Sequence, residues 1–81
     1  MMPPVNKFKR FDVRDLIHRG IEPFPEICRR MEALGAGEGL LVLAPFLPSP
    51  LIEKFGSDGF ASKVERGTGP DWMVYFWREA D

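Results

Sequence analysis

Two prolines placed just ahead of a helical apolar stripe set the strongest limit on how this chain folds. Pro23 and Pro25 suit the first turn of a helix, where a missing N–H removes no hydrogen bond. The apolar residues at helical spacing are Phe24, Ile27, Cys28, Met31 and Leu34. Gly35 and Gly37 predict the end of this helix, because glycine readily adopts positive φ.

The other segments predict four strands and a second, shorter helix. Strand patterns occupy residues 7–13, 40–44, 60–65 and 72–77. Ser49 and Pro50 are expected to begin the short helix and Gly56 to end it, while residues 15–20 form one helical turn. Strands separated by helices predict parallel neighbours, and the loop at 67–71 predicts an antiparallel hairpin. The order β-α-β-α-β-β therefore predicts an α/β (α+β) two-layer sandwich, with a four-stranded mixed sheet and two helices on one face.

Size and composition limit the classes of protein to which this chain can belong. Its 81 residues predict one domain, residues 7–81, after a flexible tail at residues 1–6. A net charge of −1 argues against general nucleic-acid binding. The most apolar stretch, residues 39–52, is interrupted by prolines and is too short to cross a membrane. A single cysteine and the lack of a signal pattern predict a cytoplasmic location.

The proline-rich helix entry and the order of elements resemble the TusA-like (SirA-like) sulfur carriers. Their fold is shared with the C-terminal domain of translation initiation factor three. Those carriers begin the first helix with Cys-Pro-x-Pro, and the matching stretch here is Glu22-Pro23-Phe24-Pro25. The resemblance implies that Glu22 stands at the position of the carrier cysteine, so the nucleophile for sulfur transfer is missing.

An uncharacterised bacterial family related to those carriers resembles the chain over about residues 10–78. The motifs that carry the resemblance are Asp12-Val13-Arg14, Gly20, Pro23-Phe24, residues 45–51, Gly59-Phe60 and residues 72–76. One branch of that family has Asp-His-Asp after the second strand, which is typical of a metal or cofactor site. This chain has Ala44-Pro45-Phe46 there, so a function that depends on that triplet does not transfer.

The sequence predicts no catalytic residue, no metal site and no cofactor. Glu22 is expected to cap the helix, because free N–H groups at a helix N-terminus attract a carboxylate. A general base is the alternative, but no second catalytic group lies nearby in the sequence. Cys28 lies on the apolar stripe and is expected to be a buried hydrophobe rather than a reactive thiol. His18 is expected at the surface, since one histidine with Asp12 and Asp15 is too few ligands for zinc.

The last strand is apolar on both sides. One side carries Trp72, Val74 and Phe76, and the other carries Met73, Tyr75 and Trp77. Residues 40–43 have the same two-sided pattern, although helices cover only one face of a two-layer fold. The set Met73, Tyr75 and Trp77 is therefore expected on an open face as a protein contact, which Phe46 and Leu47 extend. The alternatives are a cover by the N-terminal tail and a small-ligand site.

These patterns favour a non-catalytic binding or protein-interaction module that acts through the open sheet face. The expected contact is a homodimer or another protein, with no nucleic acid and no membrane. One alternative is a sulfur-relay or redox accessory protein that uses Cys28. Another is that Arg14 and Arg19 bind a small anion at the N-terminus of the helix that follows Pro23. The negative charge of Glu22 opposes this alternative.

Overall fold

Four strands form one mixed sheet in the structure, a computed structural model that describes residues 1–78. The strands are β1 (Phe8–Asp12), β2 (Gly39–Ala44), β3 (Phe60–Arg66) and β4 (Trp72–Arg78). Their order in the sheet is β1-β2-β4-β3. β1 and β2 are parallel, whereas β4 is antiparallel to both β2 and β3. The predicted crossover and hairpin are both confirmed.

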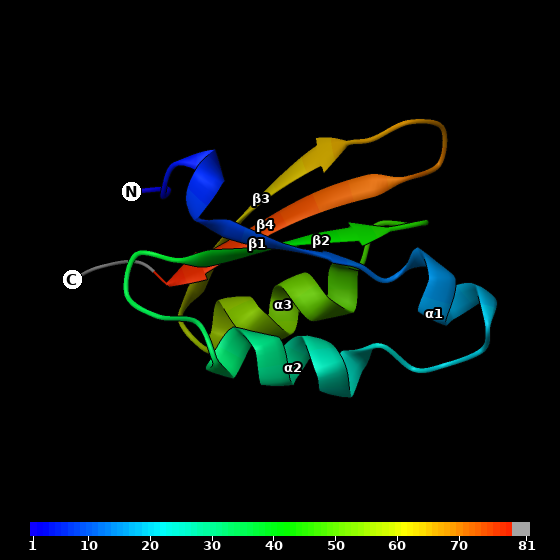
Figure 1. Cartoon of the computed structure of the whole chain (residues 1–81), viewed down its shortest axis with the longest axis horizontal. Helices are drawn as coiled ribbons and strands as arrows, with labels where there is room; N and C mark the ends of the chain where they lie inside the picture. The colour runs from blue at the N-terminus through cyan, green and yellow to red at the C-terminus, as the bar shows by residue number, and fades with distance from the viewer. Residues whose placement is uncertain (79–81) are drawn as a thin grey trace.

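Two helices cover one face of this sheet, and a third lies at its end (Figure 1). The covering helices are α2 (Phe24–Glu32) and α3 (Ser49–Ser57), and the short α1 (Arg14–His18) follows β1 directly. The predicted two-layer sandwich is therefore confirmed. A single 3-10 turn, η1 (Val5–Lys7), precedes β1. It includes the last two residues of the expected tail and Lys7, which the sequence assigned to the strand.

Two predictions about glycine at helix ends were wrong. α3 continues through Gly56 to Ser57, and the chain turns into β3 at Gly59, which has φ +92°. Gly35 also lacks the positive φ expected of it, whereas Gly37 has φ +77°. A glycine therefore ends a helix only where the following turn requires a left-handed conformation.

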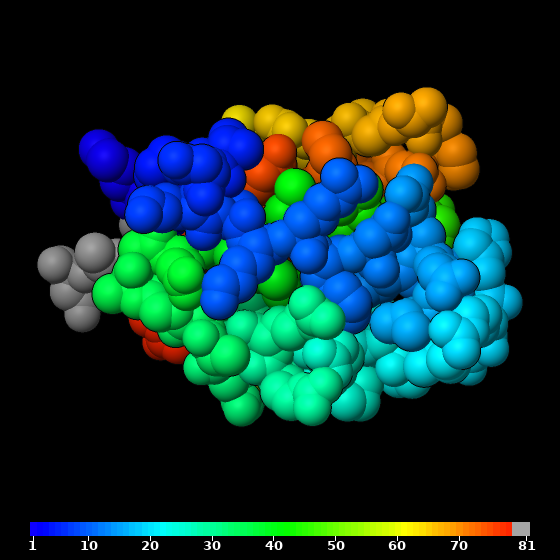
Figure 2. Space-filling model, in the orientation of Figure 1, coloured from blue at the N-terminus to red at the C-terminus, as the bar shows by residue number. Residues whose placement is uncertain are grey.

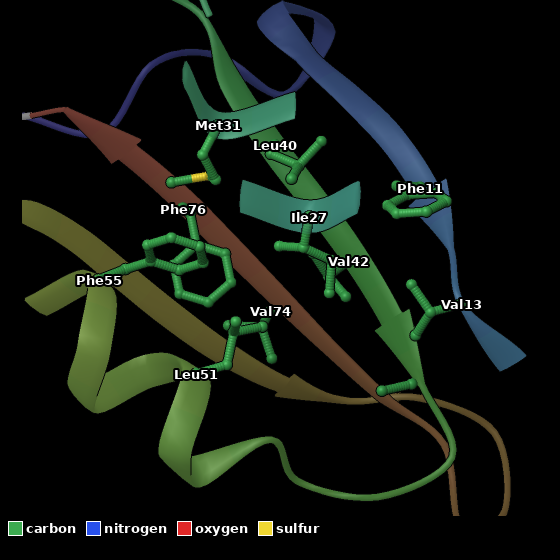
Figure 3. Packing of buried hydrophobic residues seen from close by; sticks show 11 residues of the cluster. Phe11, Val13, Ile27, Met31, Leu40, Val42, Leu51, Phe55, Val74 and Phe76 are labelled. Carbon is green, nitrogen blue, oxygen red and sulfur yellow. The ribbon is translucent and has the colours of Figure 1, made fainter. Parts of the chain in front are cut away.

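The core lies between the two covering helices and the sheet (Figure 3). Ile27 of α2 packs against the sheet over Val42, which is fully buried. From α3, the ring of Phe55 meets Phe76 of β4 at a centroid distance of 5.2 Å and an interplanar angle of 73°. Burying one such side chain contributes about 1.5 to 3 kcal/mol. These contacts hold α2 and α3 against the sheet.

The first residue of the apolar stripe departs from the predicted pattern. Ile27 and Met31 are buried, and Cys28 and Leu34 are half-buried against the core. Phe24, however, is 36% exposed. It lies in the first turn of α2, where the helix borders a hollow at the end of the sheet.

Candidate functional site

The strand register places the predicted aromatic set on the face of the sheet that α2 and α3 do not cover. Tyr75 lies opposite Leu41, and Trp77 lies opposite Gly39. Tyr75 and Trp77 are nevertheless only 8% and 6% exposed. Met73 and Leu41 are half-buried. The two aromatic residues predicted as a contact surface are thus largely enclosed within the chain.

The cover over this face comes from Phe8, the first residue of β1. Its ring centroid lies 5.1 Å from that of Tyr75 and 6.2 Å from that of Trp77, edge-on in both cases. The ring occupies the space above Gly39, where an added Cβ would come within 2.4 Å of Phe8 Cε2. Figure 2 shows the N-terminal residues, in dark blue, packed beside orange atoms of β4. The cover therefore comes from the first residue of β1, whereas the alternative left open by the sequence was a cover by the tail at residues 1–6.

Polar side chains of β3 complete the surroundings of Tyr75. Burial raises the pKa of Tyr75, and so do the charge of Glu65 and a hydrogen bond to it. Lys63 Nζ in turn lies 3.3 Å from Glu65 Oε2. Little apolar surface remains available at this point of the open face.

An apolar hollow of about 510 Å³ opens at the other place that the sequence indicated, the entry to α2. β1 and β2 are parallel, so their carboxyl ends meet at one edge, and the first residues of α2 and α3 lie at the same end (Figure 1). The side chains that line the hollow come from all of these segments and include Val13, Ile17, Glu22, Pro23, Phe24, Pro25, Phe46, Pro48, Pro50 and Leu51.

A second hollow of about 300 Å³ adjoins the first. Both are lined by Ile17, Glu22, Pro23 and Phe46, and we call the two together the α2-entry groove. Three large apolar side chains that line it stay exposed: Ile21 (42%), Phe24 (36%) and Phe46 (51%). Leu47, next to Phe46 in the chain, is 40% exposed. Elsewhere in residues 1–78, the exposed large apolar side chains are Met1, Val5 and Val64. Exposed apolar surface is thus concentrated at this groove.

Glu22 supplies the charge of the groove. Its Oε1 accepts a hydrogen bond of 3.0 Å from the Phe24 N–H, at the first residue of α2. It is also the one ionisable side chain among the residues that line either hollow. A carboxylate in this place is stabilised by the partial positive charge of the helix N-terminus.

The two arginines predicted as anion contacts do not line this groove. Arg14 donates through Nε to Asp12 Oδ1 at 2.9 Å and through Nη1 to Asp71 Oδ2 at 2.6 Å. Its hydrogen bonds hold the pKa of the Asp12 carboxyl near 2, below the usual 3.8. Arg19 pairs with Asp15 at 3.3 Å. Both guanidinium groups are therefore engaged by carboxylates of the chain itself.

The remaining reactive side chains lie apart from the groove. Cys28 is half-buried against the core, and His18 is exposed at the end of α1. Within the described part of the chain, no three His, Cys, Asp or Glu side chains are grouped so that they could hold a metal ion. Among the helices described, none is long and apolar enough to cross a membrane.

The sequence indicates most of the groove residues but does not show that they belong to one site. Glu22, Pro23 and Pro25 were assigned to a helix cap, whereas Phe46 and Leu47 were assigned to the open sheet face. In the structure, Phe46 lines the same hollows as Glu22 and Pro23 instead. A usable signal was present, because ligand sites in α/β folds gather where parallel strands end.

Comparison with known proteins identifies a family for most of the chain. A family model described as "Uncharacterized conserved protein (DUF2249)" matches residues 10–78. Neither a curated protein nor a solved structure matches the chain.

Proposed function

The chain belongs to the DUF2249 family of uncharacterized conserved proteins, and we propose that it is a non-catalytic binding module whose site is the α2-entry groove. One observation carries the proposal: Phe24 and Phe46 line a hollow of about 510 Å³ and stay exposed, as does Leu47 between the lining residues Phe46 and Pro48. A gathering of exposed apolar side chains at a hollow is typical of a binding surface.

The occupant we propose is an apolar side chain presented by a partner polypeptide. A small ligand confined to the hollow would leave the outer parts of Phe46 and Leu47, now 51% and 40% exposed, in water. A polypeptide buries both the hollow and this rim, as an anchor residue and its neighbours do at protein interfaces. The rim therefore favours a polypeptide over a metabolite.

The groove also has features that favour binding over chemistry. By resemblance to the sulfur carriers, Glu22 stands where a nucleophilic cysteine would stand, and its carboxylate already accepts the Phe24 N–H. The open sheet face is a weaker site than the groove, because Phe8 already packs on Tyr75 and Trp77. This shifts the interaction surface from β4 to the entry of α2.

A selection from a random peptide library, followed by NMR mapping on the ¹⁵N-labelled protein, tests the proposal. We expect selected peptides to share an apolar anchor and to shift the amide signals of Ile21, Phe24 and Phe46. Peptides that shift only residues remote from the groove, or a failure to select any peptide, would contradict it. Signals that depend on protein concentration alone would indicate a second copy as the partner.

Two variants make the test specific. Phe46→Ala should weaken the selected peptides about tenfold or more, since hot-spot truncations cost about 2 kcal/mol or more. Val64→Ala is the matched control, because Val64 is 39% exposed on β3 and lines neither hollow. Equal weakening by both variants would indicate a general effect of lost apolar surface rather than a groove.

A further inference from the structure

We propose that the partner of the α2-entry groove carries a cationic side chain, lysine or arginine, between two apolar anchors, and that Glu22 receives it. This inference rests on the proposed function and adds the chemistry of the occupant. It reverses the usual preference of a helix N-terminus, which binds anions through its free N–H groups.

The groove is poor in the N–H donors that an anion would need. Pro23 is the N-cap of α2 and Pro25 its second residue, so neither offers an N–H. The same holds for Pro48 and Pro50 at the start of α3. All four prolines line the larger hollow. The partial positive charge of a helix N-terminus resides on its unsatisfied N–H groups, so these prolines weaken it here.

The donor that remains between the two prolines of α2 is already used. The Phe24 N–H donates to Glu22 Oε1 at 3.0 Å. Oε1 is fixed by this bond, which leaves Oε2 able to accept from a bound group. Glu22 forms no ion pair with any described residue.

Among the residues that the structure describes, no cationic side chain lines the groove beside this carboxylate. Arg14 and Arg19 are held by acidic residues elsewhere, and neither lines a hollow. Arg29 and Arg30 on α2 are both paired with Glu26. An unpaired carboxylate beside apolar surface is complementary to a group that is both apolar and positively charged.

The position of Glu22 also fixes where the cation lies. Glu22 and Phe46 line both hollows, so Glu22 lies where the larger hollow meets the smaller one. A segment that fills both hollows therefore presents its charge between two apolar groups on one face. In an extended peptide, residues i, i+2 and i+4 share a face, which gives the pattern apolar-x-basic-x-apolar.

Three end-capped synthetic peptides test this chemistry: acetyl-Leu-Ser-Lys-Ser-Leu-amide and the same peptide with Gln or Glu at the centre. Each is titrated into the ¹⁵N-labelled protein at millimolar concentration. We expect the Lys peptide to bind up to about fivefold more tightly than the Gln peptide, and the Glu peptide to bind most weakly. The advantage of Lys should decrease in 0.5 M NaCl, because exposed charges are screened.

Glu22→Gln is the decisive variant, because its side-chain amide oxygen can still accept the Phe24 N–H while its charge is gone. Loss of the preference for the Lys peptide over the Gln peptide in this variant supports the proposal, and a preference that persists contradicts it. Equal binding of all three peptides to the unmodified protein would overturn it and leave the binding module intact. If no peptide shifts the groove signals, both the inference and the proposed function are contradicted.

Discussion

Arg14 Nη1 donates to Asp71 Oδ2 at 2.6 Å and joins the first turn of α1 to the loop between β3 and β4. The two residues are 57 positions apart in the chain, and their bond is partly buried. The same guanidinium also holds Asp12 at the end of β1. One side chain thus connects three segments at the end of the sheet that carries the α2-entry groove.

Removing the Asp71 carboxylate should destabilise the fold measurably. Asp71→Asn weakens the bond to Arg14 and should lower the free energy of unfolding by about 0.5 to 1.5 kcal/mol in urea denaturation. Asp15→Asn is the control, because the Asp15 side chain is 78% exposed in its pair with Arg19. Its effect should stay within about 0.5 kcal/mol. Equal losses in both variants would show that Arg14 forms no stabilising connection.

Acid should remove a contribution that Asp12 makes to stability. The pKa of the Asp12 carboxyl is lowered to about 2 in the folded protein, mainly because Arg14 donates hydrogen bonds to it. A lowered folded-state pKa stabilises the fold above the unfolded value of about 4, and this stabilisation is lost as the pH falls towards 2. Because Asp12 is 38% exposed, we expect about 1 kcal/mol or less. Urea denaturation of the protein and of Asp12→Asn at pH 5 and pH 2.5 should show a smaller pH dependence in the variant.

A methyl group at Gly39 should be strongly unfavourable. Its Cβ would come within 2.4 Å of Phe8 Cε2 and 2.7 Å of the Phe76 carbonyl oxygen, which is backbone and cannot move aside easily. We expect Gly39→Ala to cost about 2 kcal/mol or more. Gly56→Ala is the control, since that position is helical and nothing lies within 4 Å of its added Cβ. It should be neutral or stabilise the protein by up to about 1 kcal/mol. Thermal melting distinguishes the two, and a stable Gly39→Ala protein would contradict the close packing of Phe8.

Truncation of Phe8 should open the aromatic cover of β4. In Phe8→Ala, Trp77 and Tyr75 lose the ring that now packs edge-on against both of them. Tryptophan fluorescence should shift to longer wavelength, and the protein should associate with increasing concentration in analytical ultracentrifugation. Val5→Ala is the control, because Val5 is 68% exposed in the preceding turn. A monomeric Phe8→Ala protein with an unchanged spectrum would show that Phe8 does not provide the cover.

The sheet and the covering helices could be predicted because each depends on a local pattern. The period of the stripe around Ile27 and Met31 and the prolines ahead of it are enough to place α2. The burial of Tyr75 and Trp77 on β4 could not be predicted in the same way. The cover over Tyr75 depends on the register that brings Phe8 against Gly39, 31 positions later in the chain. No pattern within either strand determines that pairing.

The candidate site was harder to predict for a related reason. Glu22 and Phe46 are separated by a helix and a strand, and they line one groove only because β1 and β2 end at the same edge of the sheet. The exposure of Phe24 has the same origin, since its position on the apolar stripe predicts burial but a hollow lies beside it. Periodicity assigns a face to a side chain, and only the tertiary structure shows whether that face is filled.

The position of β4 between β2 and β3 also has a consequence for how the protein is made. β4 is the last of the four strands in the chain, yet it pairs with both β2 and β3. During synthesis, β1, β2 and their helices can begin to assemble, but β3 has no neighbour in the sheet until β4 has emerged. A nascent chain that stops before Trp72 would leave the β1–β2 pair with an unpaired edge and β3 with no partner strand. Quality-control proteases and chaperones are therefore expected to recognise such incomplete chains.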